Sequence, residues 1–442
     1  MNILFTEMVH HNLQWQIKLV EDGHTVYTNQ VESEHYLKSL NIHSIHDIPY
    51  HIFASQEIIK PEDIVELTNE LPLLLLERLE QAIEKYKIDL IINTWPCFNS
   101  IIHKKDLGVD IISANELSIK LETEKQFGKM FAEQCGMKTP KTLQAGDDHR
   151  ELHLKSLPQQ FVLKPSNFWN SAKVIRDKGI CEIVSIDTIM GIPTGIGYFC
   201  EEYIKGYETN ISYIMSEGDW SFTFSEHCDE SKAKEVNGGG PTAWFTDTII
   251  EQLTPEIDKQ VRDNVVDYLN AAAKLGGTYE GSITQMLGED GELYFIENNC
   301  RPYVQNSFPL PLGGNEYLDA FRNNPQKIGD CFVGKKFPKL VLQNGKEYPV
   351  HLHEKYGLPY PTNIEIIEDK YIVNPWNDSA DGLVVVFEDE INMDFVNEVE
   401  KESDFKAYWG DWDIKSYKYK SINKKVFSQR TNKWGDNYVF MG

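Results

Sequence analysis

Apolar and polar positions in the first hundred residues alternate in the rhythm of a parallel α/β fold. Helical periodicity covers 13–20, and Gly23 closes that helix. A second helical stretch at 71–87 leads into the last of three apolar runs that predict strands, which are 3–6, 25–28 and 89–93. The third run is continuously apolar, as suits a strand buried on both faces. The order predicts a doubly wound, Rossmann-like sheet.

The pattern changes near Ser118, where a charged helix is expected over 119–135, with Gly136 and then Pro140 as its exit. Further along the chain, strands are expected at 161–164 and 198–204 and a helix at 255–275. Beyond about residue 324 the chain shifts to short, aromatic-rich strands such as 383–387. We therefore expect three domains, whose ranges are 1–117, 118–325 (with a smaller subdomain at about 140–205) and 326–442.

A hairpin is expected around Asp290 and Gly291, the preferred pair for a two-residue type I′ turn. Centring the turn on them places Met286 opposite Phe295 and Thr284 opposite Glu297. It also places Glu289 opposite Glu292. Because side chains alternate along a strand, Thr284, Glu297 and Asn299 should share one face.

The charge balance limits the partners. The 68 Asp and Glu against 43 Lys and Arg give a net charge of −25, which repels nucleic acid and anionic membranes, so an anionic substrate needs a local cluster of bases. Segment 415–434 carries basic and aromatic residues without an acid, a texture compatible with single-stranded nucleic acid, but a solvated hairpin is the preferred interpretation. Nucleic acid is thus an unlikely partner.

The location follows from three negative patterns. No apolar run reaches the roughly 18 residues that a membrane helix needs, and the first residues lack the layout of a signal peptide. The seven cysteines form no C-x-x-C pair, which argues against a disulfide framework and a zinc ribbon. We expect a cytoplasmic protein without a membrane partner.

The most informative segment is Glu297-Asn-Asn299-Cys-Arg301. A carboxylate and an amide oxygen two residues apart on a strand project together, as oxygen-seeking Mg²⁺ requires when phosphates fill its other sites. Arg301 has the same parity and can fork onto a phosphate or an acyl phosphate. By themselves, three polar residues on a strand edge would more often be ordinary surface. Whether they form a metal site therefore depends on the motifs in the rest of the chain.

Several further segments occur in an order that resembles the ATP-grasp superfamily, and within it the phosphoribosylamine-glycine ligases. The resemblance covers roughly residues 1–320. The segments that carry it are Asp89-Leu-Ile-Ile-Asn93, Gly108-Val-Asp-Ile-Ile-Ser113, Lys125-Gln-Phe-Gly-Lys129, Cys135-Gly-Met-Lys-Thr-Pro140, Phe161-Val-Leu-Lys164, Glu201-Glu202-Tyr203-Ile204-Lys-Gly206-Tyr-Glu208, Gly238-Gly-Gly240 and the strand with Glu297.

This resemblance implies an ATP-grasp domain at 118–325, with its lid at about 140–205, between a Rossmann-like domain and a β-rich C-terminal domain. It implies ATP and Mg²⁺ as cofactors, with Glu297 and Asn299 on the metal and Lys164 and Arg301 as the catalytic charges. Lys125 and Lys164 would contact phosphates. The adenine hinge would act mainly through main chain, with a ribose-binding acid beyond it, and its residues are Glu201, Glu202, Tyr203, Ile204 and Glu208.

The implied activity is ATP-dependent joining of a carboxylate and an amine through an acyl phosphate, with small molecules as substrates. Three positions depart from the family pattern. The stretch 7–12 replaces the glycine-rich loop after the first strand, Ser166 to Ser171 replaces a glycine-rich lid, and Thr284 stands where many members place a second metal carboxylate. The alternative function is an ATP-binding regulatory or interaction protein that has lost catalysis.

Overall fold

The computed structural model describes most of the first 330 residues and parts of the rest. The described ranges are 1–6, 12–29, 34–48, 75–94, 102–103, 105–146, 156–166, 172–177, 180–186, 197–216, 218–229, 255–301, 312–333, 339–343, 347–349, 351–358, 364–367, 370–373, 383–387, 392–403 and 406–408.

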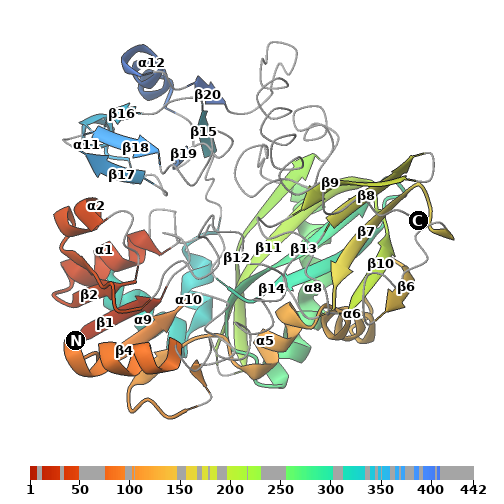
Figure 1. Ribbon diagram of the computed structural model, residues 1–442, viewed down its shortest axis with the longest axis horizontal. Coiled ribbons are helices and arrows are strands. Elements are labelled where there is room, and N and C mark those ends of the chain that lie inside the picture. Colours follow the sequence, from red (N-terminus) through yellow and green to blue (C-terminus); the bar gives the residue numbers. More distant parts are fainter. Residues whose placement is uncertain are drawn as a thin grey trace.

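The first sheet is five-stranded and wholly parallel, in the order β3-β2-β1-β4-β5 (Figure 1). The chain enters it at β1, leaves through α1 and returns one strand away, which is the right pattern for a doubly wound sheet. The predicted strands are confirmed to within one residue. The elements are β1 (Asn2–Thr6), α1 (Leu13–Glu21), β2 (Thr25–Thr28), α2 (Glu34–Ser39), β3 (Ile42–Ser44), a helix at 75–86, β4 (Leu90–Asn93) and β5 (Asp110–Ile112).

The expected single helix over 119–135 is wrong, because the chain forms two helices there, α5 (Glu116–Thr123) and α6 (Lys125–Gln134). The backbone leaves the helical region at Glu124, whose ψ is 78°. The amide of Lys125 instead donates to the carbonyl of Ser166 at 3.1 Å. Contact with the residue that follows the distant strand β7 thus sets the break and places Lys125 at the start of α6.

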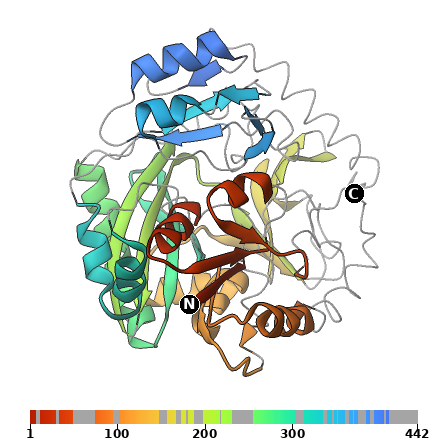
Figure 2. The same ribbon diagram turned by 90° about the vertical axis from the view of Figure 1, so that its left-hand side faces the viewer.

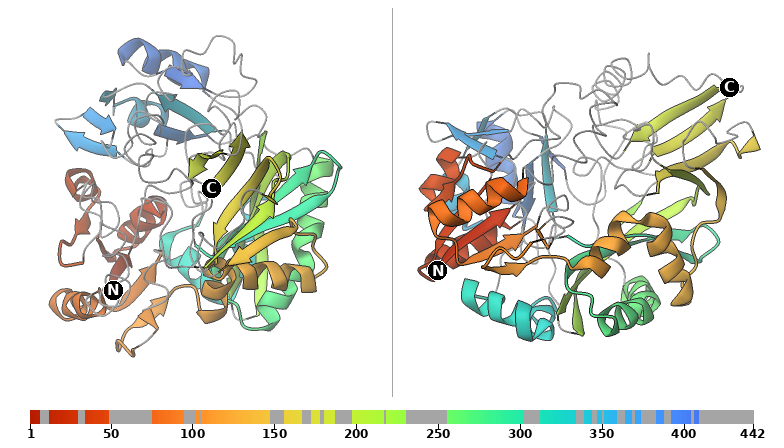
Figure 3. Two further views of the ribbon diagram at one scale, coloured as in Figure 1. Left: turned by 45° about the vertical axis from the view of Figure 1, so that its right-hand side comes forward. Right: turned by 60° about the horizontal axis from the view of Figure 1, so that its bottom comes forward.

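Two antiparallel sheets form the middle of the molecule (Figures 1 and 3). The first has the order β6-β10-β7-β8-β9 and the second β12-β11-β13-β14, with α8 packed on one face of the second. The bounds are β6 (Thr142–Gly146), β7 (Gln160–Pro165), β8 (Ala172–Asp177), β9 (Ile180–Ile186), β10 (Tyr198–Glu202), β11 (Gly206–Ser216), β12 (Asp219–Asp229), α8 (Pro255–Lys274), β13 (Tyr279–Gly288) and β14 (Leu293–Asn299).

The turn between β13 and β14 differs from the expected type I′ turn. Gly291 has φ +79° but Asp290 is not in the left-handed region, and the amide of Gly291 donates to the carbonyl of Gly288. This is a three-residue loop with the left-handed residue last. Consequently Met286 faces Tyr294 and Gly288 faces Glu292, so the predicted pairings of Met286 with Phe295 and of Glu289 with Glu292 are both wrong.

A second irregularity restores the register further along the hairpin. The pairing shifts between Thr284 and Gln285, because β14 fits one extra residue there. Beyond this bulge Thr284 faces Glu297, as predicted, and Ser282 faces Asn299. The turn error and the bulge cancel, so Glu297 and Asn299 share a face with Thr284.

Two helices return the chain toward the first sheet, as seen beneath the sheets in the right-hand view of Figure 3. They are α9 (Gly314–Asn323) and α10 (Pro325–Asp330). The indole Nε1 of Trp15 donates to the carbonyl of Gly314 at 3.3 Å, and its ring packs against those of Tyr317 and Phe321. The first sheet and the central region therefore share a core.

The remaining described elements are mostly short strands, in two antiparallel sheets ordered β19-β15-β20 and β16-β18-β17 (Figure 2). This agrees with the expected β-rich C-terminal region. The elements are β15 (Lys339–Gln343), β16 (Glu347–Pro349), α11 (His351–Tyr356), β17 (Ile364–Ile367), β18 (Lys370–Val373), β19 (Leu383–Val386), α12 (Met393–Glu402) and β20 (Lys406–Tyr408). In the described part of the chain, no helix is long and apolar enough to cross a bilayer.

Candidate active site

An ion pair joins α6 to the end of β14. Lys125 Nζ lies 2.8 Å from Glu297 Oε2, and the lysine side chain is buried while the glutamate keeps 29% of its side chain exposed. Burial by itself would raise the pKa of Glu297, but Lys125 and then Lys164 outweigh burial and lower it to about 2. Glu297 is therefore a carboxylate at any physiological pH, available to a cation.

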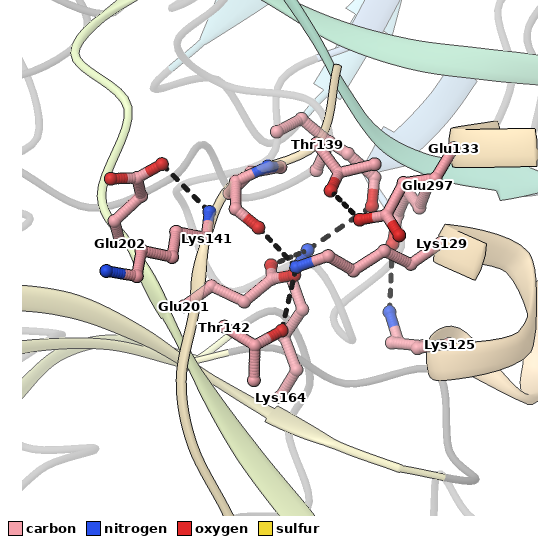
Figure 4. A network of polar contacts seen from close by, with 12 residues as sticks. Lys125, Lys129, Glu133, Thr139, Lys141, Thr142, Lys164, Glu201, Glu202 and Glu297 are labelled. Atoms are coloured by element: carbon pink, nitrogen blue, oxygen red, sulfur yellow. Dashed lines mark hydrogen bonds and ion pairs between the residues drawn. The ribbon is translucent and has the colours of Figure 1, made fainter. Parts of the chain in front are cut away.

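A second group of buried charges lies between the two antiparallel sheets (Figure 4). The carboxylate of Glu201, on β10, receives Lys164 Nζ from β7 and Lys129 Nζ from α6, each at 2.8 Å. Lys164 also donates to the carbonyl of Ile296 on β14 at 3.3 Å. Lys164 thus connects the two sheets.

These charges form one cluster, whose members are Lys125, Lys129, Lys164, Glu201 and Glu297. Three cations and two carboxylates leave it with one net positive charge, in a chain whose net charge is −25. Opposite charges in a buried site interact strongly, and the excess cation suits an anionic ligand. A chain this acidic needs a local group of basic side chains to bind an anionic substrate, and this cluster provides such a group.

The predicted hinge follows directly from β10. This strand ends at Glu202, whose carboxylate accepts from the amide of Lys141 at 2.8 Å. Tyr203 and Ile204 lie half-buried in the segment before β11, so the predicted strand 198–204 is two residues too long. Their main chain lies outside the regular strands, where a flat ring can be bound by backbone groups.

Glu208 lies on the same face of its sheet as the metal-strand residues. It accepts from Asn210 Nδ2 at 3.2 Å, and Asn210 Oδ1 accepts from the hydroxyl of Thr284 at 2.6 Å. Thr284 faces Glu297 across the strands. A continuous polar row therefore runs from Glu208 on β11 to Glu297 on β14.

Glu297 and Asn299 form a donor set of the kind that a hard cation uses. The Nδ2 atom of Asn299 donates to Glu297 Oε1 at 3.3 Å, so the two side chains are neighbours. A carboxylate and an amide oxygen suit Mg²⁺ when a ligand's oxygens complete its coordination. In the described residues no group of three or more His, Cys, Asp or Glu converges on one point.

Arg301 is held by a buried carboxylate that the sequence did not indicate. Its guanidinium pairs with Glu122 of α5, and the other oxygen of Glu122 accepts from the amide of Cys300 at 3.1 Å. Burial raises the pKa of Glu122, although Arg301 opposes that shift. The carboxylate of Glu122 therefore holds the arginine in a fixed place just after β14.

The residues between the metal-strand positions point the opposite way. Asn298 accepts from the hydroxyl of Tyr213 at 3.0 Å and donates to that of Tyr268 on α8 at 3.2 Å. All three side chains are buried. This network anchors the far side of β14, so the alternate residues Glu297 and Asn299 face the cluster.

Of the predicted site residues, the structure brings Lys125, Lys164, Glu201, Glu297 and Asn299 into one region. Lys129 and Glu122 were missed. Lys129 stands one helical turn after Lys125, a spacing that puts both on one face, so the sequence held that signal. The predicted glycine loop at 238–240, the lid positions 167–171, the stretch 7–11 and the basic segment 415–434 lie outside the described residues.

Comparison of the fold with solved structures gives several matches over nearly the whole chain. An L-amino acid ligase from Bacillus licheniformis is 12% identical with a TM-score of 0.58, covering 93% of this chain and 99% of its own. A phosphoribosylamine-glycine ligase from Thermotoga maritima is 12% identical with a TM-score of 0.53, covering 92% and 97%.

A biotin carboxylase from Campylobacter jejuni is 14% identical with a TM-score of 0.53, and the match covers 99% of this chain and 97% of the other. The sequence matches no protein-family model and no curated protein. The structural similarity shows that the chain has the ATP-grasp fold.

Proposed function

We propose that the protein is an ATP-dependent ligase that joins a carboxylate to an amine. ATP phosphorylates the carboxylate, and the amine then attacks the acyl phosphate and releases phosphate. The observation that carries the proposal is the convergence of Lys125, Lys164 and Glu297 from α6, β7 and β14. An ATP-grasp fold supplies the frame in which such a cluster lies between two sheets.

The nucleotide is assigned to the region at the end of β10. The main chain of Glu202, Tyr203 and Ile204 would bind the adenine, next to Glu201, and Glu208 would accept from the ribose hydroxyls. Because Glu208 begins the polar row that ends at Glu297, this placement sets the ribose at one end of the row and the phosphates at the other.

The residues fit a magnesium ion bound to the phosphates. Glu297 and Asn299 would hold it, since they present a carboxylate and an amide side by side. When bound, the ion would neutralise phosphate charge and align the transferred group.

The reaction asks mainly for positioning and charge neutralisation. Lys125 and Lys164 now face carboxylates and would turn to the phosphates, which is a short movement because their Nζ atoms already lie at the cluster. Arg301, oriented by Glu122, would stabilise the charge that develops on the acyl phosphate. Glu201 keeps Lys164 and Lys129 in place between the sheets.

Nucleotide binding tests the proposal directly. Millimolar Mg-ATP should raise the melting temperature, because a ligand at a hundred times its Kd stabilises the folded state by about 2.7 kcal/mol. Lys164→Met should remove most of the shift, whereas Lys259→Met, at an exposed position on α8, should keep it. Absence of any shift and of any heat in calorimetry would refute the proposed function.

A further inference from the structure

A second polar row crosses the sheet next to the metal-strand residues. Ser282 on β13 faces Ser212 on β11 on one side and Asn299 on β14 on the other. These positions alternate with Ile283 and Asn298, which point toward α8, so the row lies on the same face as Glu297. Neighbouring strands are about 4.8 Å apart, and the row therefore spans about 10 Å.

The row extends to the fourth strand. On β12, Phe222 faces α8, because Cζ of Arg262 on α8 lies over its ring, 4.9 Å from the ring centroid. Its neighbour Thr223 takes the opposite face, beside the irregular pairing of β11 and β12 at Ser212. We call Thr223, Ser212 and Ser282 the hydroxyl row.

The hydroxyl row differs sharply from the row beside it. Asn210 and Thr284 hydrogen-bond to each other. In contrast, the hydroxyls of Thr223, Ser212 and Ser282 are buried and have no hydrogen-bond partner among the residues that the structure describes. A buried hydroxyl without a partner lowers the stability of the fold. Three such hydroxyls next to the proposed reaction site therefore indicate that a bound ligand supplies their hydrogen-bond partners.

We propose that the hydroxyl row binds the carboxylate-bearing substrate, and that this substrate is a small polar acid without a phosphate group. The inference rests on the proposed function and adds the class of acid. Its carboxylate would lie by Asn299 and Arg301, where phosphorylation takes place, and its own hydroxyl, amide or amino group would bond to Ser282 and Ser212. An enclosed position also protects an acyl phosphate from water.

The charges around the row support this class of ligand. The hydroxyl row itself is uncharged, and two carboxylates flank it along the sheet: Glu297 in one adjacent row and the buried Glu280 in the other. The two cations beside it are already paired: Arg301 with Glu122 and Lys125 with Glu297. A phosphate at the row would meet two carboxylates without a free counter-charge, whereas neutral hydrogen-bonding groups find donors and acceptors there.

The first measurement separates ligand contacts from structural ones. Ser212→Ala and Ser282→Ala remove hydroxyls that have no partner in the described part of the chain, so the melting temperature of the ligand-free protein should stay equal or rise. Thr209→Val is the matched control on β11, because its hydroxyl faces the other way and donates to the carbonyl of Gln285. That variant should melt at a lower temperature. Loss of stability in both serine variants equal to that of Thr209→Val would overturn the proposal.

The second measurement is Mg-ATP-dependent phosphate release with a panel of acids and amines. The acids are the twenty L-amino acids, lactate and glycerate, together with O-phosphoserine and 3-phosphoglycerate as phosphorylated counterparts. The wild type should respond to an unphosphorylated acid. Ser212→Ala and Ser282→Ala should each raise the KM for that acid tenfold or more, with the KM for ATP within twofold, and Thr209→Val should change neither.

Each other outcome counts against the inference. An unchanged KM for the acid in the double serine variant, or preference for a phosphorylated acid, would overturn it while leaving the ligase function intact. ATP binding without a response to any acid of the panel would overturn the row as a site for such acids. Absence of ATP binding would instead refute the proposed function, and the inference with it.

Discussion

Lys125 Nζ and Glu297 Oε2 lie 2.8 Å apart, although 172 positions separate the two residues in the sequence. The contact joins the first residue of α6 to β14, the second strand of the hairpin and the edge strand of its sheet. It therefore depends on the break at Glu124 and on the register of β13 with β14. The proposed phosphate lysine and the proposed metal carboxylate neutralise each other, so both are held ready for a nucleotide.

Glu297→Gln should abolish most activity without unfolding the protein. The change keeps the shape of the side chain and removes one negative charge from the metal donor set. ATP-dependent phosphate release should therefore fall about a hundredfold or more, since each 1.36 kcal/mol added to the activation free energy slows a reaction tenfold. Adenine binding should persist, because the proposed hinge is formed by the end of β10 and the residues that follow it, not by β14. Assays of phosphate release at saturating ATP over a range of Mg²⁺ concentrations would measure the first effect, and the shift in melting temperature with ATP would measure the second.

Glu292→Gln is the control for that variant. Glu292 lies at the turn of the same hairpin, exposed, and pairs with Lys138 at 3.3 Å. Its loss should change phosphate release less than twofold. Equal damage by the two substitutions would contradict the metal assignment.

Glu201→Gln should destabilise the protein in a pH-dependent way. Burial by itself raises the pKa of Glu201, but Lys164 and Lys129 together hold it below its ordinary value. The unfolded chain therefore takes up a proton at this residue before the folded protein does as the pH falls. The contribution of the ion pairs to stability is complete above about pH 4.3 and declines below it.

Urea unfolding of the wild type and of Glu201→Gln checks this sign. At pH 7 the variant should be less stable by about 3 kcal/mol, because two buried lysines lose a charged partner. The gap should narrow at pH 4 and below. A gap that stays constant from pH 7 to 3.5 would show that the carboxylate titrates normally in the fold, and Glu289→Gln, at an exposed position, supplies the baseline.

Gly314→Ala should weaken the junction between the first sheet and the central region. A Cβ at Gly314 would lie 2.5 Å from the backbone nitrogen of Leu19, so α1 and α9 would have to separate. We expect a loss of about 1–3 kcal/mol in the free energy of unfolding. At the neighbouring Gly313 a Cβ would meet only Asp22 at 3.6 Å, so Gly313→Ala should lose only the preference for glycine at the N-cap of α9, about 0.5–1 kcal/mol.

Phosphoribosylamine with glycine should be a poor substrate pair. Glu7 and the residues after it replace the glycines that the resembling family uses to hold a phosphate near the first strand. We expect a kcat/KM well below about 10⁴ M⁻¹s⁻¹, the lower end of ordinary enzymes. Formation of glycinamide ribonucleotide at or above that value would contradict this expectation.

The sequence by itself determined the local elements and the motifs. Periodicity predicted β1, α1, β2, β4 and α8 closely, because each presents a continuous apolar face or run. Spacing also placed Glu297 and Asn299 on one strand face, since alternation is a property of any strand. The order of the motifs indicated the fold, although the domain boundaries at 117 and 325 stay a prediction.

The tertiary structure decided what depends on contact between distant segments. The break at Glu124 follows from the bond of Lys125 to Ser166, and the pairing of Arg301 with Glu122 spans 179 positions. The bulge that restores Thr284 opposite Glu297 has no glycine to mark it in the sequence. No local pattern encodes that the hydroxyls of Ser212 and Ser282 lack a partner among the described residues, because a hydrogen bond is decided by whichever atom the fold brings within reach.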